Sequence, residues 1–551
     1  MTARRTAEFL AALAAFTVLT AFFFWQTLPH LSSALLGPAE DNLQDFWNSW
    51  YTAQGHQGAF FFTRLIRAPE GVWLYYHSFA YPQIAAVWGL SRIFGTSLPT
   101  LVLLQNLTIL ASFPLAATGA FYLCRHLGGG IAGSTVGGFV FAFNPWHVAQ
   151  AMHHAHVAGI EFLPAFVLCY LLASERKSFA WLAGAIVFYA LSALSCWYFL
   201  FYCFYFLLFH LLYLRVHEQR WPRGWRMAAP AFCLAGTALL LSPLIVPMMQ
   251  SGLHSVPYQL GSDIFEADLL GYAAFPPTHL LAAWSRGLYN AFTGNDWENA
   301  TYLGIANLVL LAWGFWRAPA GERRILWYAL GGMVFFAVLA SGDTLHWGGR
   351  ALPVHTPGLV LSRLPFFANI RTPVRAIVFV YLFLGIGTAM ATAAILKTRR
   401  SAAAGAMLAL AAFLVLLDFF PAHLQTTAMN CAPDLAVLAK DGDQTSGVLD
   451  LPSGYRESNY YMAQQACHGR AIAQGAIARQ LAPTLADHLN VKNLAAQRRQ
   501  LQSAKIKFVL LHHPSGGMFK WNTRTDGELG SYRNAYTILS DTPDMTILRV
   551  D

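Results

Sequence analysis

The sequence carries little charge. Only 11% of its 551 residues are Asp, Glu, Lys or Arg, whereas a soluble globular chain carries roughly 25%. This scarcity excludes a soluble protein, because the chain has too little polar surface to stay in water. With 56% hydrophobic and 15% aromatic residues, the composition predicts a polytopic membrane protein. The formal net charge of +9 then reflects basic loops at the ends of membrane helices, and we expect no nucleic-acid partner.

Common catalytic and metal-binding motifs are also missing. The sequence contains no G-x-S-x-G elbow, no Walker-type loop, no H-E-x-x-H and no C-x-x-C, which argues against the enzyme and metal-site classes that these motifs mark. Cysteine is scarce, at seven residues, and five of these lie in or beside apolar tracts, where packing explains them. Cys431 and Cys467 lie in a polar C-terminal region, and the sequence leaves open whether they form a disulfide.

Apolar runs, by contrast, are abundant, and many are long enough to span a membrane, which takes about 17 to 25 residues. They lie near residues 8–28, 99–123, 131–146, 157–173, 179–195, 197–214, 228–249, 302–317, 325–340, 374–396 and 402–420. The first run follows Arg4 and Arg5 and has no clear cleavage site after it, so we expect it to be retained as a helix. The sequence thus predicts a mainly α-helical membrane bundle of about eleven helices.

One shorter tract, residues 80–95, decides the topology. If it spanned the membrane, the basic clusters after residue 120 would alternate wrongly with Arg4 and Arg5. If it lies in the membrane interface, the N-terminus and all of the short loops that carry these basic clusters fall on the cytoplasmic side. We therefore expect a membrane domain of residues 1–420 with its N-terminus inside and a large first outer loop at 29–98.

Residues 421–551 differ in character from the rest of the chain. They gain Asp, Gln, Asn and Lys, and they contain three short strand-like runs, at 447–451, 507–511 and 545–550. Helix-compatible stretches such as 483–504 lie between these runs. The pattern predicts a small α/β domain on the extracytoplasmic side of the membrane.

The first outer loop carries the candidate catalytic residues, Asp41 and Asp45. They are four residues apart and would share one face of a helix. Trp47, Trp50 and Tyr51 follow, which suits a helix that lies along the membrane interface. Asp41 is the candidate reactive carboxylate; the plainer alternative is that Asp41 caps this helix and Asp45 faces solvent.

A second polar cluster follows Asn144 and Pro145. It comprises His153, His154 and His156, with Glu161 nearby. Histidine titrates near neutral pH and is the commonest metal ligand, although no standard zinc spacing is present. We expect these side chains to form a wall of the substrate site; the alternative is a set of interfacial histidines that bind water and lipid headgroups.

Other candidate substrate-binding residues lie in further outer segments. They are His77, Glu266, Asp268, Glu298, Arg371, Arg375 and His468. The three carboxylates could assist Asp41 or hold a divalent cation through oxygen ligands, or they could belong to a solvated acidic loop. The two arginines are expected on the extracytoplasmic side, although basic residues usually lie on the cytoplasmic side. They could bind phosphate or anionic headgroups. His468 follows Tyr460 and Tyr461, a composition that suits a sugar or an ordinary domain contact.

This layout of one helix, an acidic outer loop, many helices and an outer C-terminal domain resembles the GT-C class of membrane glycosyltransferases. More closely, the chain resembles a group of bacterial polytopic membrane proteins related to that class. The residues that carry this resemblance are Asp41 to Trp47, His77, Asn144-Pro145, His154, Glu161, Ala267 to Leu270, Glu298, Tyr302 to Gly304, Arg371, Arg375 and His468-Gly469.

The resemblance implies transfer of a sugar from a polyprenyl-phosphate donor to a glycan, lipid or protein acceptor, at the outer face of the bacterial cytoplasmic membrane and among membrane lipids. In that class the first-loop Asp acts as a general base or a metal-associated carboxylate. Here Asn42, not a second acidic residue, follows Asp41. The sequence therefore leaves open whether the site binds a divalent cation such as Mg or Mn. The alternative function is a transporter or assembly factor for lipid-linked envelope glycans without transferase activity.

Overall fold

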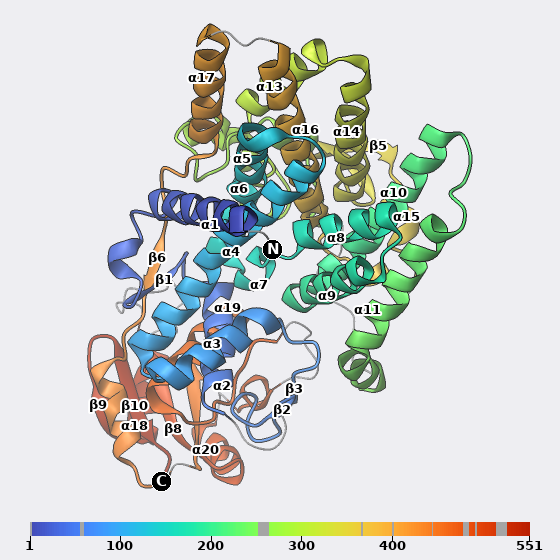
Figure 1. The fold of residues 1–551 in the computed structure, drawn as a ribbon. Coiled ribbons are helices and arrows are strands. Elements are labelled where there is room, and N and C mark those ends of the chain that lie inside the picture. The colour runs from blue at the N-terminus through green and yellow to red at the C-terminus, as the bar shows by residue number, and fades with distance from the viewer. Residues whose placement is uncertain are drawn as a thin grey trace.

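The computed structural model describes residues 3–55, 60–251, 264–364, 367–398, 402–443, 445–477, 484–490, 493–513 and 526–551 (Figure 1). Most of them are helical. Seven stretches are long and apolar enough to cross a membrane: Thr6–Phe23, Leu98–His126, Ala155–Arg176, Trp197–Glu218, Trp225–Gln250, Arg323–Ala340 and Pro373–Lys397. Three shorter apolar stretches are Phe179–Ser195, Ile305–Arg317 and Gly405–Phe419. The structure thus contains a mainly helical, membrane-type bundle, and the expected number of eleven crossings stays a prediction.

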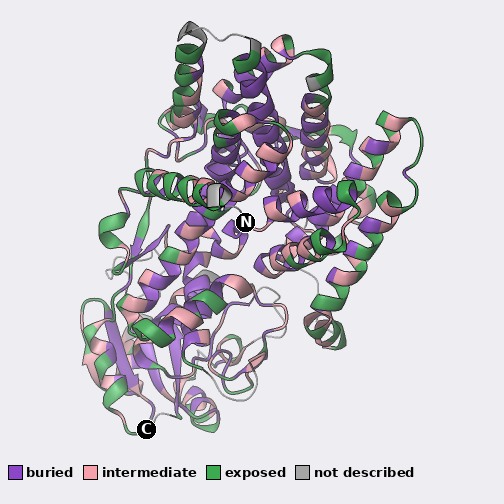
Figure 2. Cartoon of the chain, in the orientation of Figure 1, coloured by how far each residue is buried: buried purple, intermediate pink, exposed green. Residues whose placement is uncertain are grey.

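These stretches belong to the following helices: α1 (Ala3–Phe23), α4 (Leu98–His126), α7 (Ala155–Ala158), α8 (Leu163–Arg176), α9 (Phe179–Ser195), α10 (Trp197–Glu218), α11 (Trp225–Gln250), α13 (Ile305–Arg317), α14 (Ala320–Ala340), α16 (Ile377–Thr398) and α17 (Ala402–Phe419). Figure 2 shows that buried residues concentrate in the middle of this bundle, whereas α1 and α17 are largely exposed. Exposed apolar helix faces are what a bilayer would cover.

Helix α16 lies at the centre of the bundle, and almost all of its residues are buried. It packs closely against α5 (Gly130–Ala142), where Gly133 and Gly137 face Ala389 and Gly385 with no room for a Cβ atom between the two backbones. Small residues that allow such close approach are typical of helix contacts in membranes. The expected span 131–146 is therefore a short, buried helix of 13 residues.

Tract 80–95 forms α3 (Tyr81–Phe94), a helix of 14 residues, and it is not among the apolar stretches that could span. Its polar Gln83 and Ser91 are buried, while Trp88, Ile93 and Phe94 are exposed. A short helix with exposed apolar side chains at its end suits a position along the membrane surface.

The C-terminal region contains a four-stranded sheet. Its order is β7 (Gly447–Leu451), β8 (Ile506–His512), β10 (Met545–Arg549) and β9 (Thr537–Asp541), with β7 and β8 parallel and the other pairs antiparallel. Helices α18 (Ala436–Lys440), α19 (Tyr455–His468), α20 (Leu494–Ser503) and α21 (Asp526–Ala535) accompany it. Three of these strands coincide with the three strand-like runs of the sequence. Figure 1 shows the sheet at the opposite end of the molecule from the tops of α13, α14 and α17.

The segment that follows α1 and the C-terminal region share one core. Strand β1 (Ala34–Leu36) pairs antiparallel with β6 (Thr426–Ala428), and α2 (Asp41–Ala53) packs against α19. The indole N–H of Trp47 donates to the amide oxygen of Gln465 at 2.7 Å. Residues of both regions belong to a single buried apolar cluster, and a disulfide joins Cys431 to Cys467. Contacts with the C-terminal region therefore hold α2 in place, and Asp41 is the first residue of this helix.

Candidate active site

The residues of the candidate site come from five separate segments. These are the start of α2, the junction of α6 (Pro145–His153) with α7, the segment 295–299, η6 (Pro373–Ala376) and α19. Asn144 caps α6 by accepting from the backbone N–H of His147 at 2.8 Å, and Pro145 occupies the first turn. At His154 the backbone leaves helical geometry (φ −139°) before α7 begins. This break points the neighbouring histidines in different directions.

Asp41 is the outermost member of the site. Its Oδ2 lies 3.0 Å from Nε2 of His154, and its Oδ1 accepts from the side-chain amide of Asn459 at 3.0 Å. Burial alone would raise the pKa of Asp41, but His154, His156 and Asn459 outweigh it and lower the pKa to about 2. Its side chain is 36% exposed, against 8% for His154. Asp41 is therefore an ionised carboxylate at the point where this network meets solvent.

The position of the proton on His154 follows from its neighbour Gln150. The amide nitrogen of Gln150 donates to the Trp297 carbonyl at 3.3 Å and to Oε2 of Glu298 at 3.2 Å. Its oxygen therefore faces Nδ1 of His154, 2.9 Å away, so Nδ1 carries a hydrogen and donates.

The other nitrogen of His154 faces the Asp41 carboxylate. Burial lowers the pKa of His154 although Asp41 opposes it, so the neutral ring presents the Nε2 lone pair to Oδ2. Two acceptors 3.0 Å apart are held together only by a proton between them. The pair is thus arranged to take up one proton.

Glu298 and Arg375 lie behind His154. Nε of Arg375 donates to Oε1 of Glu298 at 2.8 Å, and the Arg375 guanidinium also lies over the ring of Tyr198, 4.8 Å from its centroid. Burial would raise the pKa of Glu298, but Arg375 and His154 outweigh it and lower the pKa. Both side chains are buried. Arg375 therefore neutralises Glu298 within the protein, whereas its sequence position suggested a phosphate ligand.

Asp45, His153 and His156 surround this network. Asp45 is buried, accepts from the backbone N–H of Ala155 at 2.8 Å and lies 3.2 Å from Nδ1 of His156. His153 contacts Glu40 at 3.3 Å and stacks on Trp297, with centroids 4.1 Å apart. Asp45 thus holds the start of α7 and positions His154 and His156.

Glu266 and Asp268 form a separate cluster with the hairpin of β4 (Thr344–Trp347) and β5 (Arg350–His355). Glu266 accepts from the backbone N–H of Asp343 at 2.6 Å and contacts His346 at 3.1 Å. Asp268 accepts from the backbone N–H groups of Gly348 and Gly349 at 3.0 and 2.7 Å. Both carboxylates therefore stabilise the turns around residues 342–349.

Three other candidates lie outside the network. His77 bonds Asn48 at 2.7 Å between aromatic rings, and burial lowers its pKa to about 3. His468 accepts from the backbone N–H of Arg470 at 3.1 Å, and burial lowers its pKa to about 4. Glu161 is half-buried, and its Oε2 has no hydrogen-bond partner among the described residues. Within the described part of the chain, no contact of these three residues reaches Asp41.

Arg371 lies four residues before Arg375 and is half-buried. Its guanidinium lies 5.9 Å from the ring centroid of Phe265. The segment that carries it is anchored by the hydroxyl of Tyr202, which donates to the Thr372 carbonyl at 3.2 Å. Arg371 and Arg375 therefore lie on the same anchored segment, and Arg375 makes the salt bridge to Glu298.

Sequence reasoning missed Gln150, Trp297 and Asn459. Gln150 lies one helical turn before His154, and that spacing could have drawn attention to it. Trp297 precedes Glu298 directly in the chain. Asn459 gave no signal, because 418 positions separate it from its partner Asp41.

The donor set does not fit a cation held by the protein alone. Among the described residues, no three His, Cys, Asp or Glu side chains are grouped to hold a metal ion. Asp41 and His154 supply two donors that face each other, while His156 faces Asp45 and Glu298 faces Arg375. Protein sites for divalent ions commonly use three or more such ligands. We therefore assign the proposed catalytic roles to protein side chains.

Comparison with protein families gives one match over most of the chain. The model of the family described as Domain of unknown function (DUF6311) matches residues 9–420. No protein of curated function matches the sequence significantly. The match includes every candidate residue named above except those in the C-terminal region.

Comparison with solved structures finds oligosaccharyltransferases. The apo form of the Archaeoglobus fulgidus enzyme is 12% identical, with a TM-score of 0.53, and the match covers 94% of this chain and 71% of that chain. The same archaeal enzyme, AglB, in complex with an inhibitory peptide and dolichol-phosphate is 12% identical, with a TM-score of 0.52 over 93% and 70% of the two chains. These are GT-C folds, so the predicted GT-C-like fold is confirmed. The narrower bacterial group stays a prediction.

Proposed function

The chain belongs to the family described as Domain of unknown function (DUF6311), and we propose that it is a membrane glycosyltransferase that moves a sugar from a polyprenyl-phosphate donor to an acceptor outside the cytoplasm. The observation that carries this proposal is the Asp41–His154 pair, a half-exposed proton acceptor at the start of the first-loop helix. The GT-C-like fold supports it, since glycosyl transfer is the chemistry of its oligosaccharyltransferase neighbours.

In the proposed reaction an acceptor hydroxyl attacks the anomeric carbon of the donor sugar. As the new C–O bond forms, the hydroxyl proton passes to Oδ2 of Asp41 and is then shared with Nε2 of His154, 3.0 Å away. The bond between the anomeric carbon and the phosphate oxygen breaks, and its electron pair leaves with the polyprenyl phosphate. A positioned base of this kind contributes about 10²- to 10⁴-fold to the rate.

The surrounding residues hold this pair in place. Gln150 fixes the ring of His154, and the buried Glu298–Arg375 pair fixes Gln150. Asn459 holds the other oxygen of Asp41 from α19. We assign the leaving phosphate to Arg371, a half-buried guanidinium on the anchored segment that also carries Arg375.

The proposed outer location rests on two features. The network and the C-terminal sheet are joined through α2 and α19, so they share one side of the membrane. The Cys431–Cys467 disulfide is typical of an oxidising compartment such as the bacterial periplasm. The bacterial cytoplasmic membrane remains our proposed location.

The function is tested by incubating the purified chain in nanodiscs with a total lipid extract that contains polyprenyl-linked sugars. Mass spectrometry follows the loss of lipid-linked sugar and the appearance of free polyprenyl phosphate. We expect turnover with the wild type once an acceptor fraction from the cell envelope is added. Binding of the lipid-linked sugar without turnover under every acceptor fraction would instead support a carrier or assembly factor.

A further inference from the structure

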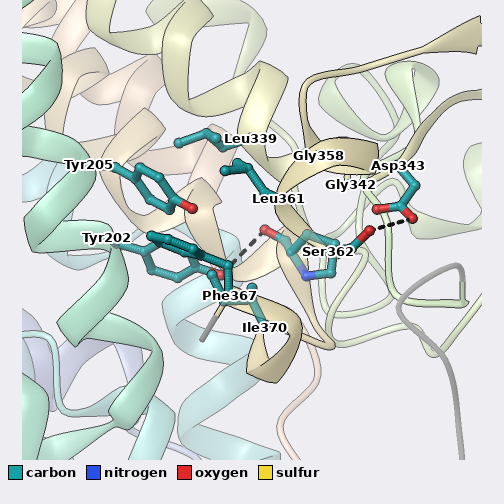
Figure 3. Close-up of a pocket in the computed structure, with 11 residues that line it drawn as sticks. Tyr202, Tyr205, Leu339, Gly342, Asp343, Gly358, Leu361, Ser362, Phe367 and Ile370 are labelled. Carbon is teal, nitrogen blue, oxygen red and sulfur yellow. Dashed lines mark hydrogen bonds between the residues drawn. The ribbon is translucent and has the colours of Figure 1, made fainter. Parts of the chain in front are cut away.

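A narrow pocket lies next to η6, but it is too small for a sugar. Figure 3 shows its lining, which includes Tyr202, Tyr205 and Leu361. The space among these side chains holds little more than water molecules, whereas a site for a small organic ligand encloses about 300–1,000 Å³. This pocket therefore offers no place for an acceptor sugar, and an open surface of the molecule is a better candidate.

The short hairpin that follows α2 carries an open surface of aromatic rings. Its strands are β2 (Phe62–Thr63) and β3 (Val72–Trp73), which pair antiparallel. Val72 and Leu74 are buried. Trp73 between them is exposed, and Tyr75 after them is half-buried. The β2–β3 hairpin thus buries its aliphatic side chains and turns aromatic ones outward, where a strand that merely faced water would carry polar residues.

Four rings of this hairpin form a stacked series. The ring of Tyr75 stacks on those of Trp73 and Phe61, with centroids 5.5 and 4.9 Å apart and interplanar angles of 8° and 19°. The ring of Phe62 packs against Trp73, with centroids 5.0 Å apart. Parallel rings at these distances are offset, so part of each stacked face stays uncovered, and Trp73 is 48% exposed. We call Phe61, Phe62, Trp73 and Tyr75 the aromatic platform.

The backbone beside the aromatic platform is held by the C-terminal region. The N–H of Arg67 donates to the carbonyl of Gln474 at 2.7 Å. In return, the N–H of Ile472 donates to the carbonyl of Leu65 at 2.8 Å. Gly71 closes the turn at φ +76°, where a Cβ atom would collide with the backbone of β2. The aromatic platform is therefore positioned before any ligand binds, which lowers the entropy cost of binding.

The aromatic platform lies near the end of α2 that is opposite to Asp41. The ring of Tyr51, in the last turn of α2, packs on Phe60 with centroids 5.9 Å apart, and Phe60 packs on Phe61 at 5.1 Å. Figure 1 shows β2 and β3 next to α2, at the end of the molecule that holds the C-terminal sheet. The ten residues from Asp41 to Tyr51 rise about 15 Å. Several linked sugars, but not a single one, would cover this length.

The surroundings of the aromatic platform favour a sugar over a bilayer. Arg64, Pro69 and Glu70 are exposed beside it, and the Arg64 guanidinium lies 5.9 Å from the ring centroid of Phe62. Charges of both signs would be costly in lipid. An exposed apolar patch with a polar rim is typical of a ligand site. A pyranose matches both parts, because its C–H face stacks on aromatic rings and its hydroxyls bond the rim.

We propose that the aromatic platform binds a sugar chain of the acceptor, so that the acceptor is a glycan or a molecule that carries one. This inference rests on the proposed function and adds to it the chemical class of the acceptor. Membrane lipids and polypeptides are the competing occupants, and the experiments below separate them from a glycan.

The test is binding of cellotetraose and chitotetraose to the purified full-length chain in nanodiscs, measured by saturation-transfer nuclear magnetic resonance without any donor. Both probes are β-linked chains with equatorial substituents, which leave the ring faces free for stacking. We expect both probes to bind, with saturation transferred mainly to the axial C–H groups. Failure of both probes to bind the wild type would overturn the proposal.

A matched pair of substitutions tests the place of binding. Trp73→Leu keeps an apolar side chain and removes the ring, and Trp284→Leu makes the same change at an exposed tryptophan of α12 (Ala282–Tyr289). We expect Trp73→Leu to weaken binding about tenfold, since one stacked ring contributes this much, and Trp284→Leu to leave it unchanged. Equal binding by Trp73→Leu and the wild type would overturn the proposal, because a surface that is only apolar tolerates leucine.

Fluorine nuclear magnetic resonance of the fluorotryptophan-labelled chain separates the competing occupants. The Trp73 signal is assigned with Trp73→Phe. We expect it to shift with cellotetraose and to be broadened by a water-soluble gadolinium chelate. Broadening by a spin-labelled phospholipid instead would assign the aromatic platform to the bilayer. An equal shift with a peptide digest at the same concentration would assign it to polypeptides. Either result would overturn the proposal.

Failure of this inference differs from failure of the proposed function. Sugar binding that depends on Trp73, with no transfer under any acceptor fraction, would leave the glycan site in place and remove the transferase. Transfer with the same KM for the acceptor in the wild type and Trp73→Leu would remove the glycan site and keep the transferase. If Trp73→Leu does not fold, as judged by its melting temperature, Tyr75→Leu carries the same test.

Discussion

Two groups of carboxylates in this molecule have different environments. In the hairpin cluster, Asp268 accepts only from backbone N–H groups among its described contacts. Glu266 accepts from those of Asp343 and Thr344 and also contacts His346. In the network, Asp41 and Glu298 face ionisable side chains, namely His154 and Arg375. A backbone N–H cannot exchange its proton during a reaction, whereas an imidazole can. We propose that Asp41, which combines an imidazole partner with exposure to solvent, has a chemical role, whereas the backbone contacts of Glu266 and Asp268 indicate a structural one.

The largest effect should come from removing the carboxylate of Asp41. Asp41→Asn keeps the shape of the side chain but cannot take the acceptor's proton, so we expect transfer to fall about 10²- to 10⁴-fold. The measurement is the rate of polyprenyl-phosphate release by the reconstituted chain, with the melting temperature as a check on folding. Asp268→Asn, in a carboxylate of the hairpin cluster, is the control, and an equal loss of transfer per folded molecule there would shift the chemical role away from Asp41.

Breaking the buried Glu298–Arg375 pair should mainly affect stability. Glu298→Ala leaves the Arg375 guanidinium buried and unpaired, which costs about 3–5 kcal/mol of unfolding free energy. The double variant Glu298→Gln with Arg375→Gln leaves no unpaired charge and should lose less than the single variant. Unfolding in mixed micelles measures both, and equal losses would show that the two side chains are not coupled.

The hairpin cluster should respond in stability and not in chemistry. Asp268→Ala removes the acceptor of three backbone N–H groups, those of Leu270, Gly348 and Gly349, and we expect a loss of about 1–3 kcal/mol. Transfer per folded molecule should stay at the wild-type rate. A loss of transfer without loss of stability would place Asp268 in the chemistry and erase the contrast between the two groups.

The smallest effect on the transfer rate is expected at Asn459, which reaches Asp41 from the C-terminal region. Asn459→Ala removes one hydrogen bond to a charged oxygen, worth about 1.5–3 kcal/mol in such pairs, and part of this loss should appear as slower transfer. It should also raise the pKa of Asp41, because the amide helps to lower it. Nuclear magnetic resonance of the labelled carboxyl group measures that shift, and an unchanged pKa would contradict the contact.

Much of the fold is visible in the sequence. Long apolar runs mark the membrane-type helices, because a helix that crosses a bilayer needs about 17 to 25 mostly apolar residues. The strand-like runs near 447, 507 and 545 coincide with β7, β8 and β10. Residues 131–146 show the limit of this reasoning: the apolar run that predicts a span forms the shorter helix α5, because Asn144 and Pro145 start the next helix, α6.

The candidate site is only partly visible in the sequence. Asp41, His154 and Glu298 stood out as polar residues in outer segments, and the structure brings them together. Their roles depend on partners far away in the chain, such as Arg375 for Glu298 and Asn459 for Asp41. The same composition rules singled out Glu266 and Asp268, whose carboxylates hold turns. Sequence spacing cannot separate these cases, because tertiary contacts decide what each carboxylate faces.

The central claim is that Asp41 and His154 together accept the proton of the acceptor hydroxyl. Its most direct test is the dependence of the transfer rate on pH for the wild type and for His154→Gln. Because burial lowers the pKa of His154, the neutral ring that can share the proton persists below pH 6.5, the ordinary value for histidine. Wild-type transfer should therefore hold at neutral pH and fall only at lower pH, as His154 becomes protonated before the substrate arrives. His154→Gln should be slower at neutral pH and should lack this acidic fall, whereas identical profiles for the two proteins would contradict the account.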